Sequence, residues 1–259
     1  MPELPDIEMF RREAGKCANK KISGVTVRDA DFVDFSQKKG STKLKNKTIK
    51  DATRRGKHLL VSVGDGILAM HFGMTGELHC FSKDDAEPEH TKFSLMTESG
   101  KVLHYTCTRK LGHIRLVDDK ESYINKEVPA PDALNMDEDA FISALKEKKS
   151  MVKSALTDQD IISGIGNVYS DEILFHARIH PRQSIAKLGD DDMHRLYKKM
   201  RYVLNMAIER HANISEFPDS WLLPRRREGA SCPRCDGELQ KIKLAGRGTW
   251  LCPACQKKY

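Results

Sequence analysis

Four cysteines near the end of the chain place the strongest constraint on its fold. They read CPRC, sixteen further residues, and CPAC. Each C-x2-C pair can wrap one ion so that two thiolates reach it, and two pairs complete a tetrahedron. We therefore expect Cys232, Cys235, Cys252 and Cys255 to bind one structural zinc ion and to leave no coordination position open for catalysis. Four reduced cysteines without metal are the alternative, which this paired spacing disfavours.

The segment between the two cysteine pairs is basic. It reads KIKLAGRGTW and predicts a hairpin with Arg247 at its tip, which would suit a phosphate contact. A solvated loop is the alternative for this segment alone. Residues 221–259 carry nine Lys and Arg against three Asp and Glu, while the whole chain has a formal net charge of +7. This balance favours a polyanionic partner.

The start of the chain, MPELPDIE, is acidic and rich in proline. It lacks the positive and apolar regions of a secretory signal, and no apolar run of the chain is long enough to cross a bilayer. We therefore expect no membrane association and a cytoplasmic protein, associated with the nucleoid if the cell is prokaryotic. In that compartment Cys17, Cys80 and Cys107 are expected to be reduced, buried small hydrophobes.

The spacing of apolar residues changes along the rest of the chain and indicates which segments are helices and which are strands. Residues 5–16 repeat apolar side chains at helical spacing, and Pro5 suits a first helical position. Residues 22–117 form short β-like runs, among them hairpins around residues 64–66 and 99–100, which predict an antiparallel sandwich or barrel. The acidic, proline-containing residues 118–133 predict a linker.

After the linker the period becomes helical. Asp137 suits the N-cap of a helix that carries Phe141 and Leu145 on one face, and further helices are expected over residues 151–156, 168–177 and 191–210. The predicted organisation is a β-rich domain over residues 1–117, an acidic hinge over 118–133, a helical domain over 134–224 and a zinc finger over 225–259.

Three parts of the chain together resemble one family. These are the start PELPDIE, the middle LTDQDIISGIGNVYSDEILFHARIHP, and the four-cysteine finger with an arginine in its hairpin. In this order they resemble the formamidopyrimidine-DNA glycosylase/endonuclease VIII family of base-excision repair enzymes, over essentially the whole chain. The resemblance implies an α+β fold, with an N-terminal helix and antiparallel β-sandwich before a helix-two-turn-helix domain and a zinc-finger β-hairpin.

The resemblance also implies an activity. Members are bifunctional DNA glycosylases and apurinic/apyrimidinic lyases, so a monomer acting on double-stranded DNA with damaged bases or abasic sites is expected. In the family the initiator methionine is removed and the exposed proline, here Pro2, attacks the sugar C1′. An α-amino group titrates near ~8, so part of it is unprotonated at neutral pH. Glu3 would donate a proton to the opening sugar ring, Lys57 would assist β-elimination, and Arg247 would support δ-elimination.

The expected DNA contacts are also implied by the resemblance. Met74, in HFGMTG, would fill the gap left by the flipped nucleotide, and Arg109 would enter the same gap and pair with the opposite base. His90 matches another DNA-contacting position, and Leu111 stands where the branch that acts on purine lesions usually has Phe. In the helical domain, phosphates would be bound by Lys149, Lys153 and Asn167, the last after a glycine turn at a helix N-terminus.

Each of these residues also has a plainer interpretation. PELP can be an extended leader that caps the first helix, Lys57 an ordinary surface lysine, Met74 core packing in a turn, and GIGN only a connector between helices. The segment between the long helix and the first cysteine is shorter than in the 8-oxoguanine enzymes and holds three consecutive arginines, Arg225 to Arg227. The short segment favours pyrimidine lesions, hydantoins or ring-opened purines as substrates.

Two other functions compete with a repair enzyme. The first is a non-catalytic protein that binds damaged or structured DNA on the same scaffold, and the second is a zinc-ribbon protein that binds RNA. An intact Pro2, Glu3 and Lys57 favour the enzyme over the first alternative. An antiparallel N-terminal domain with Met74 and Arg109 on adjacent loops disfavours the second.

Overall fold

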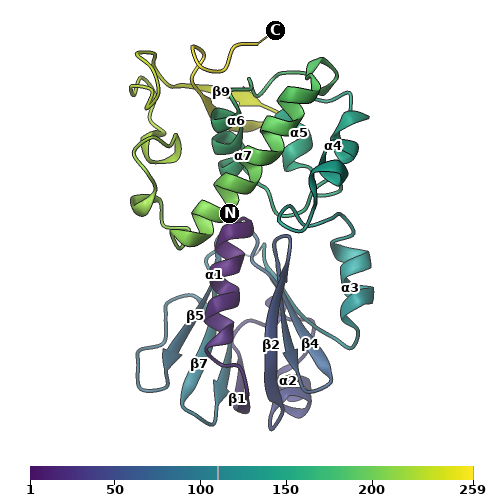
Figure 1. Ribbon diagram of the computed structural model, residues 1–259. Coiled ribbons are helices and arrows are strands. Elements are labelled where there is room, and N and C mark those ends of the chain that lie inside the picture. The colour runs from purple at the N-terminus through teal and green to yellow at the C-terminus, as the bar shows by residue number, and fades with distance from the viewer. Residues whose placement is uncertain (110, 259) are drawn as a thin grey trace. The chain divides into compact units, whose positions relative to one another are not determined.

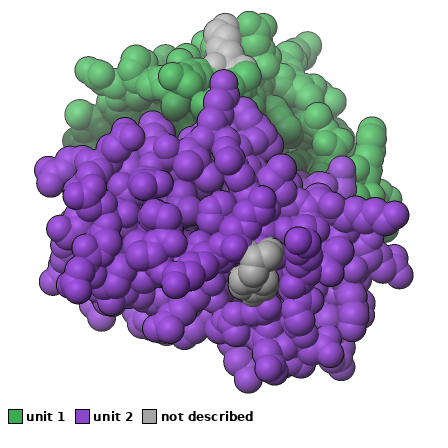
Figure 2. Space-filling view, turned by 90° about the horizontal axis from the view of Figure 1, so that it is seen from above, with its two compact units in different colours: residues 1–2, 6–129 green, residues 3–5, 130–259 purple. Residues whose placement is uncertain are grey.

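The computed structural model describes residues 1–109 and 111–258. The chain divides into two compact units, of which unit 1 comprises residues 1–2 and 6–129 and unit 2 comprises residues 3–5 and 130–259 (Figure 2). The division at residues 129 and 130 falls within the segment predicted as a hinge. The first residues of the chain are therefore shared between the units, with Glu3 to Pro5 belonging to unit 2.

Unit 1 is built on eight antiparallel strands in the order β5-β7-β6-β1-β2-β3-β4-β8 (Figure 1). β1 pairs with β2 through Lys20 and Lys21 and with β6 from Ile22 onward, with a register shift between Ile22 and Gly24. This shared strand joins a four-stranded layer, β5-β7-β6-β1, to a five-stranded layer, β1-β2-β3-β4-β8, which confirms the predicted antiparallel sandwich. The strands are β1 (Lys20–Val27), β2 (Thr48–Arg55), β3 (His58–Val63), β4 (Gly66–His71), β5 (Gly76–Ser82), β6 (Thr91–Thr97), β7 (Lys101–Cys107) and β8 (His113–Val117).

The core of unit 1 lies between these layers and includes one face of the first helix. Helix α1 (Leu4–Gly15) buries Ile7 and Ala14 against strand residues such as Leu59 and Leu95. Cys17, Cys80 and Cys107 are all buried in this unit, as their scattered positions predicted. The predicted hairpins are present as β3–β4 and β6–β7.

Two further helices complete unit 1 together with a short 3-10 turn, η1 (Ala30–Phe32). Helix α2 (Gln37–Leu44) begins after Ser36, whose hydroxyl accepts a hydrogen bond from the amide of Lys39. The acidic segment predicted as a linker contains helix α3 (Lys120–Glu127), which Asp119 caps at its N-terminus. The prolines that suggested a linker come after this helix has ended. Asp119 and Glu121 at its start suit the positive end of the helix dipole, and Tyr123 packs against Leu60 and Ala69 of the sheet.

Unit 2 is helical, with a small two-stranded sheet. Asp137 caps α4 by accepting a hydrogen bond from the amide of Ala140, as predicted, and Phe141 and Leu145 are buried in the core. The helices are α4 (Glu138–Lys146), α5 (Val152–Thr157), α6 (Asn167–Ala177) and α7 (Asp190–Glu209), with 3-10 turns η2 (Ile185–Lys187), η3 (Ile214–Glu216) and η4 (Leu223–Arg225) and strands β9 (Gln240–Leu244) and β10 (Arg247–Leu251).

Over the described part of the chain, every helix is too short or too polar to span a bilayer.

Candidate functional site

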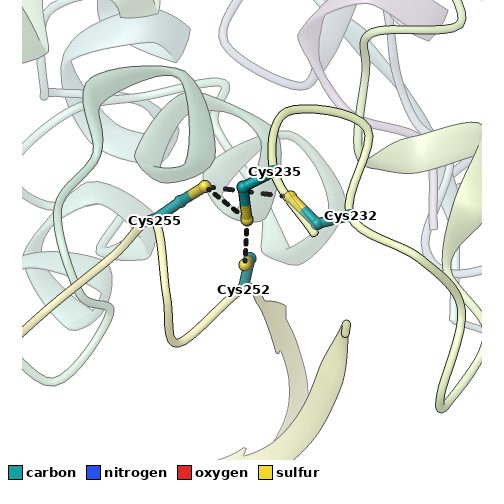
Figure 3. A group of neighbouring side chains, drawn as sticks. All are labelled: Cys232, Cys235, Cys252 and Cys255. Carbon is teal, nitrogen blue, oxygen red and sulfur yellow. Dashed lines mark hydrogen bonds between the residues drawn. The ribbon is translucent and has the colours of Figure 1, made fainter. Parts of the chain in front are cut away.

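The four cysteines of unit 2 converge on one point (Figure 3). Their Sγ atoms lie within 4.8 Å of one another, and individual Sγ–Sγ distances are 3.4 Å for Cys235–Cys255, 3.6 Å for Cys235–Cys252 and 3.8 Å for Cys232–Cys255. A tetrahedral zinc ion with Zn–S bonds of about 2.3 Å requires sulfur separations of about 3.8 Å. The geometry therefore fits one zinc ion held by four thiolates, as the spacing of the cysteines predicted.

Glu3 is fixed at the N-terminus of α6. Its carboxylate accepts hydrogen bonds from the backbone amides of Gly166 at 2.8 Å, Val168 at 2.8 Å and Tyr169 at 3.1 Å, and only 2% of the residue is exposed. Gly166 is the N-cap of α6 and has no side chain with which to satisfy these amides. The Glu3 carboxylate takes the place of an N-cap side chain, at the end of the helix where the dipole favours an anion.

The glycines of the SGIGN turn make this arrangement possible. A Cβ atom on Gly166 would lie 2.3 Å from Cδ of Glu3, and a Cβ on Gly164 would lie 2.7 Å from Cδ1 of Leu4. Gly164 has a φ of +109°, which also favours glycine. The amide of Leu4 donates a hydrogen bond to the carbonyl of Gly164 at 3.0 Å. Glu3 and Leu4 thus pack directly against the backbone of residues 164–166, where a side chain larger than that of glycine would overlap them.

Three of the predicted DNA-contacting residues of unit 2 line one groove. Lys153 of α5, Asn167 at the start of α6 and Arg247 at the start of β10 border a hollow of about 410 Å³. Arg247 is exposed beside the Ala245–Gly246 turn, at the tip of the hairpin as predicted. The side-chain amide of Asn167 donates to the carbonyl of Gly248 at 3.0 Å, which ties α6 to the finger.

Lys153 is almost fully buried although it borders this groove. Its ammonium donates to Oδ1 of Asp171 at 2.6 Å and to Oγ1 of Thr249 at 2.7 Å. The other carboxylate oxygen, Oδ2 of Asp171, accepts from the amide of Trp250 and from Arg226, each at 3.1 Å. A phosphate contact at Lys153 therefore stays a prediction, because in this structure its ammonium is committed to protein partners.

The role of Asp171 as a partner for Lys153 was not predicted. Burial raises the pKa of Asp171 and lowers the pKa of Lys153, while their mutual attraction opposes both shifts. The pair joins α5 to α6, and the hydrogen bond from Trp250 joins both helices to the finger. An aspartate four residues after the Asn167 helix start is a pattern too common to signal such a role.

In unit 1, Met74, Arg109 and Leu111 meet on neighbouring turns. Nη1 of Arg109 lies 3.9 Å from Sδ of Met74, and the amide of Arg109 donates to Oγ1 of Thr75 at 2.9 Å. Met74 is 42% exposed and Leu111 is 57% exposed, which is unusual for apolar side chains of this size. A Cβ on Gly73 would lie 2.5 Å from the carbonyl carbon of Leu111, so the two turns touch through their backbones. Two exposed apolar side chains and an exposed arginine thus lie on adjoining turns.

The remaining predicted residues are Pro2, Lys57, His90 and Lys149. Lys57 is half-buried in the turn between β2 and β3, and the exposed His90 has a φ of +60° just before β6. The carbonyl of His90 accepts from the amide of Cys107, which places it near the end of β7. Lys149 is exposed between α4 and α5 in unit 2. Pro2 is half-buried, and its nitrogen forms the peptide bond to Met1.

A histidine stack in unit 1 was not predicted. His58, His71 and His113 face one another on adjacent strands, with ring centroids 4.8 Å apart for His58–His71 and 5.3 Å apart for His71–His113. Nδ1 of His58 lies 2.9 Å from the hydroxyl of Tyr123. Burial, followed by the neighbouring histidines, lowers the pKa of His58 to about 3 and that of His71 to about 4. The three positions are far apart in the sequence, so only the strand register reveals them.

Three family models match the chain in order. One described as formamidopyrimidine-DNA glycosylase N-terminal domain matches residues 1–114, and one described as formamidopyrimidine-DNA glycosylase H2TH domain matches residues 128–219. A third, described as a zinc finger found in FPG and IleRS, matches residues 231–258 and supports zinc as the metal of the four cysteines.

Curated proteins and solved structures are similar over the same length. Formamidopyrimidine-DNA glycosylases of Heliobacterium modesticaldum and Pelotomaculum thermopropionicum are 33% and 32% identical, with at least 99% of each chain covered. A solved complex of Lactococcus lactis Fpg with DNA containing an abasic site has a TM-score of 0.88 at 31% identity, covering 99% of this chain and all of that one. A complex of the same protein with DNA containing an oxidized pyrimidine has a TM-score of 0.88 at 30% identity, with the same coverage.

Proposed function

The chain belongs to the formamidopyrimidine-DNA glycosylase family, and on that premise we propose that it excises oxidatively damaged bases from double-stranded DNA and then cleaves the strand at the abasic site. The proposed reaction is that of a bifunctional glycosylase and apurinic/apyrimidinic lyase. It would act as a monomer, in the cytoplasm or at the nucleoid of a prokaryotic cell.

One observation supports this function above the others, namely the three hydrogen bonds that hold Glu3 at the start of α6. A residue whose only task was to lead into the first helix would not need its carboxylate buried and bound by three amides. Pro2 precedes Glu3 directly, so anchoring Glu3 also restrains the position of the Pro2 nitrogen. A nucleophile that is held in place loses little entropy when it reacts.

The proposed chemistry begins after removal of Met1 frees the secondary amine of Pro2. The unprotonated amine attacks C1′ of the nucleotide, the bond from C1′ to the damaged base breaks, and the base leaves with the electron pair. Glu3 would give a proton to the ring oxygen as the sugar opens to an iminium ion. Lys57 would assist removal of the C2′ proton in β-elimination, and Arg247 would hold the phosphate that leaves in δ-elimination.

The DNA contacts follow from the two groups of residues described above. Met74 and Leu111 are exposed apolar side chains beside Arg109, and such side chains can enter the gap that a flipped nucleotide leaves in the duplex. In unit 2, Asn167 and Arg247 border a groove at a helix N-terminus, where a phosphate is favoured. His90, Lys149 and Lys153 are proposed as further contacts, with Lys153 requiring its ion pair to open.

The segment before the finger bears on the choice of lesion. Residues 210–231 contain two amides, of Leu222 and Leu223, that donate to the buried carboxylate of Glu172 at 3.1 and 2.7 Å. Arg226 is bound to Asp171 from the same segment. A short segment held this closely to α6 has little length left to fold over a flipped base. We propose oxidised pyrimidines, hydantoins and ring-opened purines as the preferred substrates over 8-oxoguanine.

A trapping experiment tests the nucleophile. The protein with Met1 removed is incubated with a duplex that contains one abasic site, in the presence of borohydride, which reduces an imine to a stable amine. We expect a covalent adduct, and mass spectrometry of its peptides should place the DNA on Pro2. Protein that keeps Met1 or carries an N-terminal tag should bind the same duplex with similar affinity and form no adduct.

The same experiment decides between the enzyme and a non-catalytic binding protein. A binding protein on this scaffold would hold the abasic duplex without forming an adduct in either preparation. A crosslink on another residue would show that the protein is a lyase with a different nucleophile. Duplexes that each contain one defined lesion then test the proposed substrate preference, which fails if 8-oxoguanine is released fastest.

A further inference from the structure

A second basic pocket lies in unit 2 at the C-terminal end of α6. It has a volume of about 610 Å³ and is lined by His176, Arg178, Arg195, Lys199 and Arg234. These residues come from α6, the residue that follows it, α7 and the finger. The groove with Asn167 lies at the other end of α6, and an 11-residue helix is about 16 Å long at its rise per residue. The two sites are therefore separate.

Two of the cations in this pocket have structural partners. Nε of Arg195 donates to the carbonyl of Ala177 at 2.8 Å, and Nη1 of Arg234 donates to the carbonyl of Phe175 at 2.8 Å. Arg195 also pairs with Asp192. These bonds satisfy the last carbonyls of α6, where a cation is favoured by the helix dipole. Helix capping thus explains Arg195 and Arg234.

Capping does not explain Arg178 and Lys199. Over residues 1–109 and 111–258, neither side chain forms an ion pair, and Nζ of Lys199 lies over the ring of Tyr202, 5.4 Å from its centroid. Arg178 is exposed and has a left-handed backbone, with a φ of 57°, at a position that usually takes glycine or asparagine. Arg178 and Lys199 are thus available to a ligand. Arg178 is an arginine at a left-handed backbone position, which disfavours residues other than glycine and asparagine.

An exposed aromatic ring lies beside His176 and Lys199, two residues that line this pocket. Tyr202 is 40% exposed, and its ring centroid lies 5.3 Å from that of His176. The faces of Trp221 and Phe217 that pack nearby are buried, so Tyr202 is the ring that a ligand can reach. Positive charge indicates an anionic ligand, and an accessible ring beside it indicates one that also has flat aromatic groups.

We propose that this pocket binds single-stranded nucleic acid, with phosphates at Arg178 and Lys199 and a base stacked on Tyr202. A duplex is disfavoured as the ligand because its bases are stacked inside and cannot present a face to Tyr202. The site goes beyond the proposed repair reaction and does not depend on it. It would let one molecule hold an unpaired strand while the groove at the other end of α6 remains available.

The charges are tested with the full-length variant Arg178→Gly/Lys199→Gln. Glycine suits the left-handed backbone at position 178, so the melting temperature should not fall. For a fluorescein-labelled thymidine oligonucleotide we expect the Kd to rise about tenfold, because two phosphate contacts are lost, while the Kd for an undamaged duplex stays within about twofold. The control variant Lys38→Gln/Lys39→Gln removes the same charge from exposed residues of α2 and should leave both affinities within that range.

Stacking is tested by photocrosslinking with an oligonucleotide that contains 5-iodouracil. The crosslinked peptide should contain Tyr202, and Tyr202→Leu should lose most of the product. The proposal is overturned if the double variant binds single strands as the parent does, or if duplex affinity falls in parallel. It is also overturned if tripolyphosphate displaces the oligonucleotide at equal phosphate concentration and no crosslink forms at Tyr202, which would leave only a general anion site.

Discussion

The backbone amide of Gly166 donates a hydrogen bond of 2.8 Å to the carboxylate of Glu3, at a position where any side chain on residue 166 would overlap that carboxylate. The contact joins Glu3 to a helix start more than 160 residues later in the sequence. It gives the SGIGN turn a physical purpose, which is to leave room for the chain terminus and to supply amides for it.

Replacing Gly166 with alanine should disrupt the contact between Glu3 and the start of α6. The added Cβ would lie 2.3 Å from Cδ of Glu3, so either Glu3 or the start of α6 must move. We expect a loss of stability of about 1–3 kcal/mol from overpacking. We also expect a fall in adduct formation on the order of 100-fold, because the nucleophile is misplaced. Chemical denaturation and single-turnover trapping measure the two effects.

Gly189→Ala is the matched control for this variant. Gly189 is the N-cap of α7 in the same unit, and a Cβ there would meet nothing within 4 Å. Alanine at an N-cap that held glycine changes stability by at most about 1 kcal/mol, and trapping should be unchanged. Equal trapping rates for Gly166→Ala and the parent protein would show that the position of Glu3 is not needed for the reaction.

Removal of zinc should unfold the finger and weaken DNA binding. We expect one zinc ion per chain by elemental analysis, and loss of that ion in Cys252→Ser, since four thiolates are needed for the closed site. The finger carries Arg247, and its Trp250 amide donates a hydrogen bond to Asp171. The affinity for duplex DNA should therefore fall when the zinc ion is removed. Cys80→Ser, a buried cysteine of unit 1, should keep one zinc per chain. A zinc content that is unchanged in Cys252→Ser would remove that residue from the ligand set.

The histidine stack should make unit 1 sensitive to acid. The pKa of His58 falls from about 6.5 when unfolded to about 3 when folded, so the unfolded chain binds more protons between these values. The contribution of His58 to the free energy of unfolding is complete above pH 6.5 and declines as the pH falls toward 3. The melting temperature of His58→Gln should therefore fall less between pH 7 and pH 5 than that of the parent protein. Parallel curves for the two proteins would show that His58 does not carry this dependence.

Local patterns in the sequence predicted most of the fold. Periodicity located α1, α6 and α7, turn residues located the hairpins β3–β4 and β6–β7, and Asp137 marked the start of α4. Helix α3 was missed because Pro129 and Pro131 suggested a linker, although both follow the end of the helix. What stabilises α3 is long-range, since Tyr123 packs against Leu60 and Ala69 of distant strands. Such packing leaves no local signal.

Residue types predicted the site better than they predicted its internal bonds. The cysteine spacing was sufficient for the metal centre, and the glycine turn indicated a close approach of backbone at α6. The partner in that approach, Glu3, lies at the other end of the sequence, and its bonds to Gly166, Val168 and Tyr169 depend on the fold of unit 2. The Lys153–Asp171 pair and the histidine stack are likewise visible only once distant segments are placed together.

The buried pair of Lys153 and Asp171 makes a prediction about stability that separates structure from DNA contact. Lys153→Met leaves a buried carboxylate without its ammonium, and Asp171→Asn leaves a buried ammonium without its carboxylate. Asp171→Asn should cost about 3 kcal/mol or more, because it leaves the buried ammonium of Lys153 without a counter-charge. Lys153→Met should cost less, because Asp171 keeps its ion pair with Arg226. In the double variant neither charge remains, so its loss of stability should be smaller than the sum of the two single losses. Chemical denaturation of the four proteins gives this coupling directly.

The same four proteins test whether Lys153 also contacts phosphate. If it does, duplex affinity in Lys153→Met should depend less on salt, with the slope of log K against log salt reduced by about one. Arg247→Ala provides the reference, since the exposed Arg247 should show that reduction without a comparable loss of stability. A salt slope for Lys153→Met equal to that of the parent, together with a strong coupling to Asp171, would assign Lys153 to the framework that holds the finger against α6. Additive losses of stability, within about 0.5 kcal/mol, would instead show that the ion pair seen here does not contribute as a pair.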